Sequence, residues 1–343
     1  MTFVDEMRAE LAKALRARSE SPIPDAMVPE FHPVEPADAP REMIGVDGSY
    51  SFLLNLSSWW LALVSVALLK FGFDGSAYHR RRHRLEQRVI GVSTWEEYVE
   101  QQDELHKALF EFTANTPAEH RPREMVNEYR RLTEGQLAIN FAEDERECFV
   151  SIDGALQEFP KRFEFMGRLV KVCEDRGHIL LGISKDSTLH TFGHMLTDEE
   201  FLRRCEPVAG DGPLYVKAPT AVESARRGLL YGDVYFAKLH RQAPKWFRID
   251  VGTHRDDPHF VFGQIAPYCR SLLSVGYAMP LLEAHRMAVT VRQLRAPYLE
   301  MVIRTAVGMG MEIREVLDGL TAMEGRRAGA FHEYLDRIAR GLR

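Results

Sequence analysis

The most apolar stretch of the chain, residues 52–73, constrains the fold more than any other feature. It reads FLLNLSSWWLALVSVALLKFGF, which is nearly long enough to span a bilayer, since a membrane helix needs about 20 apolar residues. Asn55, Ser57 and Ser58 interrupt it, and its valines and paired tryptophans are residue types that favour strands. We therefore expect a buried pair of strands here, with a membrane-spanning helix as the alternative.

Strand-like and helix-like segments alternate after residue 148, which indicates an α/β fold. CFVSIDGAL and HILLGISKDS are strand-like, and the segment FPKRFEFMGRLVKVCEDRG between them favours a helix that ends at Gly177. This order implies at least one parallel βαβ unit. Residues 233–240 and 245–252 then favour an antiparallel pair, with Pro244 in the connection.

The remaining segments favour helices, turns and a linker. Residues 1–20 have the pattern of a charged amphipathic helix, and the proline-rich residues 21–41 are typical of an extended linker. The basic residues 78–88, YHRRRHRLEQR, suggest a turn that leads to another strand. Helices are expected from Thr94 to about residue 143, over residues 197–205, and from residue 280 to the end, with capping boxes at Thr94/Glu97 and Thr197/Glu200.

Composition narrows the classes of protein. A formal net charge of −6 over 343 residues argues against indiscriminate nucleic-acid binding, although a local basic groove stays possible. The N-terminus lacks the apolar core of a signal peptide, so we expect a cytoplasmic protein with no membrane association. No Walker A motif is present, so ATP-driven motion would have to come from a partner. None of the four cysteines lies at a C-x-x-C spacing, and we expect reduced thiols: Cys148, Cys173, Cys205 and Cys269.

Two acids follow β-type runs and are each followed by glycine. Asp47 lies in MIGVDGSYS and Asp153 in CFVSIDGAL, and Glu134 lies in the helical segment between them. Carboxylates from different elements can hold Mn²⁺ or Mg²⁺, and two such ions can clamp the oxygens of a phosphodiester. Because Asp-Gly is also a common turn dipeptide, the pattern alone leaves a purely structural role open.

Two other groups of possible metal ligands are weaker. They are His254, Asp256, Asp257 and His259 in GTHRDDPHF, and the pair His190 and His194. No helix or strand spacing organises the first, and in the second, whose histidines lie four residues apart as on a helix, Gly193 disfavours a helix.

Five short motifs, taken in order, resemble those of the NurA nuclease family. They are IGVDGSYS, RRLTEG, VSIDGAL, GISKDS and YAMPLLEAHRMAV, and they extend over residues 41 to about 300. The resemblance implies an RNase H-like fold akin to the PIWI domain, with a mixed sheet flanked by helices. It also implies a Mn²⁺-dependent DNA nuclease with 5′→3′ exonuclease and single-strand endonuclease activity. Such a protein would work as a homodimer with the hexameric ATPase HerA on DNA ends, in repair or defence.

The resemblance also implies roles for particular residues. Asp47, Glu134, Asp153 and His285 would bind one or two Mn²⁺ ions, with Mg²⁺ as a substitute, and Tyr235 would be the tyrosine beside the metal. Lys185 would meet a phosphate. The sequence departs from the family pattern at YAMPL and in an insertion around HTFGHMLTDEE.

The basic cluster offers further DNA contacts, through phosphate pairing by arginine and stacking by tyrosine. It comprises Tyr78, Arg80, Arg81, Arg82 and Arg84, and a solvated turn is its alternative interpretation.

We expect an N-terminal helix and linker over residues 1–41, a nuclease domain over 42–310 and a helical extension over 311–343. The alternative function is a catalytically silent RNase H-like subunit that binds DNA or acts as an adaptor in a translocase complex.

Overall fold

The computed structural model describes residues 3–19, 23–56, 58–156, 165–187, 189–193, 196–219, 231–252, 257–312, 314 and 316. The strands in this part of the chain are β1 (His32–Pro33), β2 (Met43–Asn55), β3 (Trp59–Phe73), β4 (Tyr78–Ser93), β5 (Phe149–Asp153), β6 (Ile179–Ser184), β7 (Leu214–Lys217), β8 (Asp233–Lys238) and β9 (Phe247–Val251). The helices are α1 (Phe3–Ser19), η1 (Asp25–Met27), α2 (Glu96–Glu100), α3 (Glu104–Phe112), α4 (Arg121–Asp144), α5 (Phe165–Arg176), α6 (Asp198–Ala209), α8 (Pro258–Ile265), η2 (Ala266–Cys269), α9 (Met279–Ala288), α10 (Thr290–Gln293) and α11 (Arg295–Gly308).

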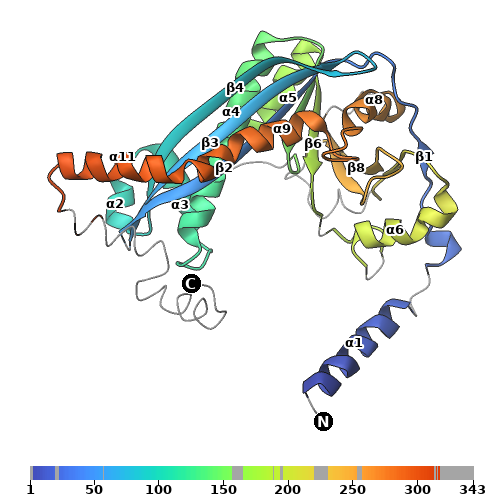
Figure 1. Cartoon of the computed structure of the whole chain (residues 1–343), viewed down its shortest axis with the longest axis horizontal. Helices are drawn as coiled ribbons and strands as arrows, with labels where there is room; N and C mark the ends of the chain where they lie inside the picture. Colours follow the sequence, from blue (N-terminus) through green and yellow to red (C-terminus); the bar gives the residue numbers. More distant parts are fainter. Residues whose placement is uncertain are drawn as a thin grey trace.

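One mixed sheet joins the described strands, in the order β1-β7-β8-β9-β6-β5-β2-β3-β4. Its three long strands β2, β3 and β4 form an extended antiparallel ribbon, and α9 and α11 run along one face of that ribbon (Figure 1). The helix α4 covers the opposite face of the ribbon, and α5 packs beside α4 against β6 (Figure 1). The molecule therefore has three layers, with the sheet in the middle, while α1 stands apart from them and exposes its described side chains.

The apolar run forms strands, as expected. Residues 52–55 end β2, and residues 59–73 are β3, which is buried along nearly its whole length because helices cover both of its faces. Among the described residues, no helix combines the length and the hydropathy that crossing a membrane requires. The prediction of a buried strand pair is thus confirmed.

The parallel unit is also confirmed and forms the centre of the sheet. β5 pairs with β6 in parallel, with α5 between them in sequence, and Gly177 ends α5 with φ +71°. β2 adds to the other side of β5 in parallel, with Val46 opposite Ile152. β8 and β9 form the expected antiparallel pair at the other side of β6.

Alternate residues of β2 face different helical layers. Met43 packs in the cluster that contains α8 and α9, whereas Ile44 packs in the cluster that contains α4 and α5. Gly45 faces the α9 side, where a Cβ atom would lie 2.3 Å from the carbonyl carbon of Pro280. Glycine at this position lets the start of α9 lie directly on the sheet.

Several expectations at the chain's periphery need correction. Residues 78–88 belong to the edge strand β4 and do not form a turn; 15 of the residues of β4 pair with β3. The helix expected from Thr94 is divided into α2, which follows Trp95 without a side-chain cap, and α3, which Asp103 caps. The Thr197 cap is confirmed, since its side chain accepts a hydrogen bond from the Glu200 amide.

The two terminal segments bear on the expected domain boundaries. The segment expected to be a linker contributes β1, which pairs with β7. Residues 317–343, most of the expected C-terminal extension, lie outside the described residues.

Candidate functional site

Two carboxylates lie side by side on neighbouring parallel strands. Val46 of β2 is opposite Ile152 of β5, so that the next residues, Asp47 and Asp153, continue the same register. Asp47 is only 1% exposed, and Asp153, the last residue of β5, is half-buried. Their positions follow from strand pairing, which brings together residues about a hundred positions apart in the sequence.

A third carboxylate, that of Glu134 on α4, reaches this point from the opposite layer through the gap at Gly48. A Cβ atom on Gly48 would lie 2.4 Å from Oε1 of Glu134, so glycine is needed to admit the side chain. Nη1 of Arg130, one helical turn earlier, donates to the same oxygen at 2.5 Å and to the Gly48 carbonyl at 3.2 Å. Burial raises the pKa of Glu134 to about 7; the charges of Asp47 and Asp153 add to the rise, and Arg130 opposes it.

An imidazole from α9 is held by the first carboxylate. Nδ1 of His285 lies 2.7 Å from Oδ2 of Asp47. Because an ionised carboxylate only accepts hydrogen bonds, Nδ1 carries the proton, and Nε2 keeps its lone pair in the neutral ring. Asp47 thus orients His285 so that Nε2 can bind a cation or exchange a proton.

A tyrosine holds the second carboxylate. The hydroxyl of Tyr277 donates to Oδ1 of Asp153 at 2.9 Å, and the tyrosine is 6% exposed. Burial, together with the nearby charges of Asp153 and Asp47, raises the pKa of Tyr277 well above its ordinary value. The hydroxyl therefore stays protonated and acts as a hydrogen-bond donor.

Lys185, directly after β6, bridges the two aspartates. Its ammonium lies 3.0 Å from Oδ2 of Asp153 and 3.6 Å from Oδ2 of Asp47. The side chain is 38% exposed, so the ammonium can exchange these carboxylates for another anion. We call Asp47, Glu134 and Asp153 the acidic cluster. The Lys185 ammonium and the Arg130 guanidinium balance the negative charge of these three acids.

The turn after Asp153 is fixed by a buried ion pair. Gly154 has φ +104°, a conformation that favours glycine, and its amide donates to the Ile183 carbonyl. The Leu156 amide donates to Oδ2 of Asp250 at 3.0 Å, and Arg248 holds Asp250 through bonds of 2.7 and 2.8 Å. From the sequence, Arg248 and Asp250 were expected only to be part of a strand, and neither was assigned a role.

The structure places Tyr235 away from the acidic cluster. It lies on β8, which β9 and β6 separate from β5, and its ring packs against Tyr215 and Phe262. Tyr277 occupies the position beside a carboxylate that was expected for Tyr235. A signal for it was available, since Tyr277 opens the same motif, YAMPLLEAHRMAV, that contains His285.

The basic cluster lies on β4, at the edge of the sheet, and its arginines pair with other acids. Arg81 approaches Glu42, Arg82 pairs with Glu145 at 3.2 Å, and Arg84 pairs with Glu86 at 2.6 Å. Arg80 is exposed on the same strand.

Tyr78, at the start of β4, is oriented by internal contacts. Its hydroxyl donates to the Pro267 carbonyl, and its ring lies against Phe73 and Tyr268. These contacts direct the ring to the protein interior instead of toward an approaching base.

The weaker metal candidates receive no support in the described part of the chain. His254, Asp256 and His194 lie outside the described residues. Asp257 caps α8 by accepting from the His259 amide, and Nδ1 of His190 lies 2.8 Å from the Leu196 carbonyl oxygen.

The acidic cluster fits a hard divalent cation by its chemistry. Within the described residues, no three His, Cys, Asp or Glu side chains converge closely enough, in these rotamers, to hold a metal ion. The donors are nevertheless three carboxylates and an oriented imidazole, the ligands that Mn²⁺ and Mg²⁺ accept. A cationic group, the Lys185 ammonium, already lies between the carboxylates of Asp47 and Asp153. Side-chain rotations would be needed to complete a metal site.

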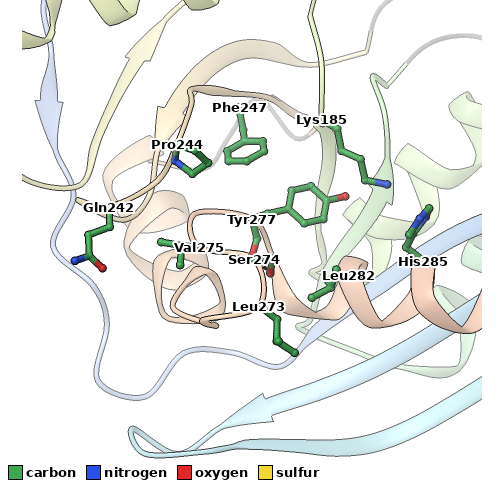
Figure 2. Close-up of a pocket in the computed structure, with 10 residues that line it drawn as sticks. All are labelled: Lys185, Gln242, Pro244, Phe247, Leu273, Ser274, Val275, Tyr277, Leu282 and His285. Atoms are coloured by element: carbon green, nitrogen blue, oxygen red, sulfur yellow. Dashed lines mark hydrogen bonds between the residues drawn. The ribbon is translucent and has the colours of Figure 1, made fainter.

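A cavity of about 530 Å³ adjoins the acidic cluster. Lys185 and His285 lie at one end of it, and the ring of Tyr277 lies between them and Pro244 (Figure 2). The cavity therefore meets the acidic cluster through Lys185 and His285, whose side chains contact Asp153 and Asp47.

Together, the strand order and the two aspartates on adjacent parallel strands define an RNase H-like α/β fold, the class that was expected. The crystal structure of the NurA nuclease from Sulfolobus solfataricus superimposes with a TM-score of 0.50 at 14% identity, covering 88% of this chain and 95% of that chain. The resemblance to NurA is thereby confirmed at the level of the fold.

More distant likenesses were found to an Endonuclease V from Bacillus subtilis, with a TM-score of 0.40 at 12% identity, covering 87% of this chain and 95% of that chain. The Argonaute of A. aeolicus gives a TM-score of 0.33 at 11% identity, covering 75% of this chain and 28% of that chain. No family model matches the sequence, and neither does any curated protein.

Proposed function

We propose that this protein is a metal-dependent nuclease that hydrolyses phosphodiester bonds in DNA. The observation that carries the proposal is the acidic cluster itself, in which carboxylates from β2, β5 and α4 share the cations Lys185 and Arg130. Buried like charges are costly, so their convergence is typical of functional sites. His285, Tyr277 and Lys185 add a proton-exchanging group and two hydrogen-bond donors at the same place.

Mn²⁺, or Mg²⁺ in its place, would be held by Asp47, Glu134 and Asp153, with Nε2 of His285 as a further ligand, and one or two ions are compatible with this donor set. The bound metal would supply a nucleophilic water at neutral pH and positive charge for the phosphate.

The chain's own residues would position the substrate and move protons. The Lys185 ammonium would leave Asp153 and donate to a non-bridging oxygen of the phosphate, where negative charge increases in the transition state. Tyr277 would keep Asp153 oriented. Where Nε2 of His285 is not a metal ligand, it would exchange a proton with a reacting oxygen, and Asp47 would set its tautomer.

Finer properties rest on the ordered motifs that resemble the NurA family. They are 5′→3′ exonuclease and single-strand endonuclease activity, a homodimer, and a HerA-type hexameric ATPase as the partner in processing DNA ends. The arginines of β4 would then contact the DNA backbone beyond the site, by exchanging their acidic partners for phosphates.

The test is Mn²⁺-dependent cleavage of labelled single-stranded DNA by the Asp47→Asn variant. We expect a loss of about 100-fold or more, because the variant removes a charge from the acidic cluster. Asp186→Asn is the matched control, since Asp186 neighbours Lys185 in sequence, is 90% exposed and pairs with Lys245. An undiminished rate for Asp47→Asn would refute the assignment. Wild-type protein without metal-dependent cleavage, alone or with a HerA-type ATPase, would favour the adaptor function.

A further inference from the structure

The cavity beside the acidic cluster has an apolar wall that the reaction itself does not require. Five of the ten residues that line it are purely apolar, and a sixth presents an aromatic ring: Pro244, Phe247, Leu273, Val275, Leu282 and Tyr277. The rings of Phe247 and Tyr277 lie 5.5 Å apart between centroids. A water molecule and a phosphate need no such surface, so this wall points to an additional, apolar part of the ligand.

The loop at the mouth of the cavity exposes two leucines. Leu272 is 91% exposed and Leu273 is 75% exposed, yet only Leu273 lines the cavity. Backbone hydrogen bonds hold this loop, from the Ser274 amide to the Ser271 carbonyl and from the Gly276 amide to the Cys269 carbonyl. The apolar wall is therefore preformed, and exposed leucines beside it are typical of a binding surface.

Charge along the cavity is asymmetric. Lys185 and His285 lie at one end, next to the acidic cluster, and Gln242 and Pro244 lie at the other (Figure 2). Among the described residues that line the cavity, none is acidic. A ligand with an anionic group at the Lys185 end and a flat apolar group further in would match both features.

A nucleotide within a strand has this form. We propose that the cavity binds the unstacked base of the nucleotide next to the phosphate that Lys185 contacts. This inference rests on the proposed function, because it assigns the cavity to the same DNA strand. Phe247 and Tyr277 would supply the aromatic part of the surface, Leu273 would cover the base, and Gln242 could hydrogen-bond to its edge.

The inference defines the substrate class more narrowly. A base within a duplex is paired and stacked, so it would have to leave its partner before it could enter the cavity. A single strand, or the frayed end of a duplex, presents such a base at lower cost. The cavity would therefore select unpaired DNA.

The experiment measures equilibrium binding without metal, by fluorescence anisotropy, so that cleavage plays no part. The probes are a labelled oligothymidylate and a labelled strand of equal length in which every nucleotide is abasic. We expect the full-length protein to bind the strand with bases about tenfold more tightly, as one stacked base supports.

Two variants locate this preference in the cavity. Leu273→Ser should weaken binding of oligothymidylate by about threefold to tenfold and leave binding of the abasic strand unchanged. Leu272→Ser, the matched control, should behave as wild type with both probes. Equal affinity of the wild type for both probes, or equal losses for the two variants, would overturn the inference.

Failure of the proposed function would be seen separately. It would show as no cleavage of oligothymidylate with Mn²⁺, whatever the binding preference is.

Discussion

Replacing Gly48 with alanine should open the acidic cluster while leaving the protein folded. The added Cβ atom would lie 2.4 Å from Oε1 of Glu134 and 2.9 Å from Cγ of Arg130. Non-bonded atoms of this kind prefer separations of about 3.5 Å, so the Glu134 carboxylate must retreat by about 1 Å. The carboxylate is the free end of a flexible side chain, and it can rotate without moving the backbone of α4.

The expected magnitudes for activity and stability differ. A displacement of about 1 Å at a catalytic group can cost about 100-fold in rate, and we expect a loss of this order. Overpacking usually costs about 1–3 kcal/mol, and here the lower end applies because a side-chain terminus gives way. Gly48→Ala should therefore lose most of its activity with only a small decrease in the free energy of unfolding.

The assay combines single-turnover cleavage of labelled single-stranded DNA with urea denaturation. Gly72→Ala on β3 is the matched control, because its nearest contact would be Nε of Arg81 at 3.3 Å, on a flexible side chain. In the Gly48→Ala background, Glu134→Asp shortens the displaced side chain and should restore part of the activity. A Gly48→Ala rate within twofold of the wild type would refute the reasoning.

Three further predictions concern charge. Because the pKa of Glu134 is raised to about 7, Mn²⁺ must displace a proton from this carboxyl at lower pH. The affinity of the protein for Mn²⁺ should therefore rise between about pH 6 and pH 8. Isothermal titration calorimetry in buffers of different ionisation enthalpy should detect the released proton. Lys185→Met should increase Mn²⁺ affinity severalfold but lower the cleavage rate, whereas a lysine that only stabilises the fold would change neither. Asp250→Asn should lower the free energy of unfolding by about 3 kcal/mol, because it leaves Arg248 buried without its counter-charge. Glu300→Gln, in the exposed pair with Arg304, should cost less than about 1 kcal/mol in the same denaturation experiment.

Local patterns were sufficient to predict the centre of the fold. The apolar run and the strand–helix–strand order predicted β3, β5, β6 and α5, because burial on both faces leaves a continuous apolar signature. That Asp47 and Asp153 meet was implied only by the resemblance to the NurA family, and the structure explains it by the parallel pairing of β2 with β5. The dipeptide Asp47-Gly48 does not end a strand in a turn, as its sequence suggested, but lies within β2, and the space beside Gly48 is filled by Glu134.

Features that depend on the order of the strands were not accessible from local patterns. β4 carries arginines and histidines on both of its faces, so it lacks the alternation of a half-buried strand, and its pairing with β3 decides its structure. The choice between Tyr235 and Tyr277 depends in the same way on where β8 and the start of α9 lie relative to β5. The pairing of Arg248 with Asp250 follows from their spacing of two along β9, but its role depends on the turn that it anchors.

The counter-charges of the acidic cluster explain how it can fold before any metal binds. The buried carboxylates of Asp47 and Glu134, next to the half-buried Asp153, would be strongly destabilising without compensation, which Lys185 and Arg130 provide. The two cations differ in mobility, since Arg130 is 18% exposed and its guanidinium is also bonded to Asn127 and the Gly48 carbonyl, whereas Lys185 is 38% exposed. An incoming divalent cation would therefore displace Lys185 and leave Arg130 in place. The released ammonium would remain at the mouth of the site, where the phosphate must enter. We therefore infer that Lys185 first stabilises the metal-free fold and then binds the phosphate of the substrate.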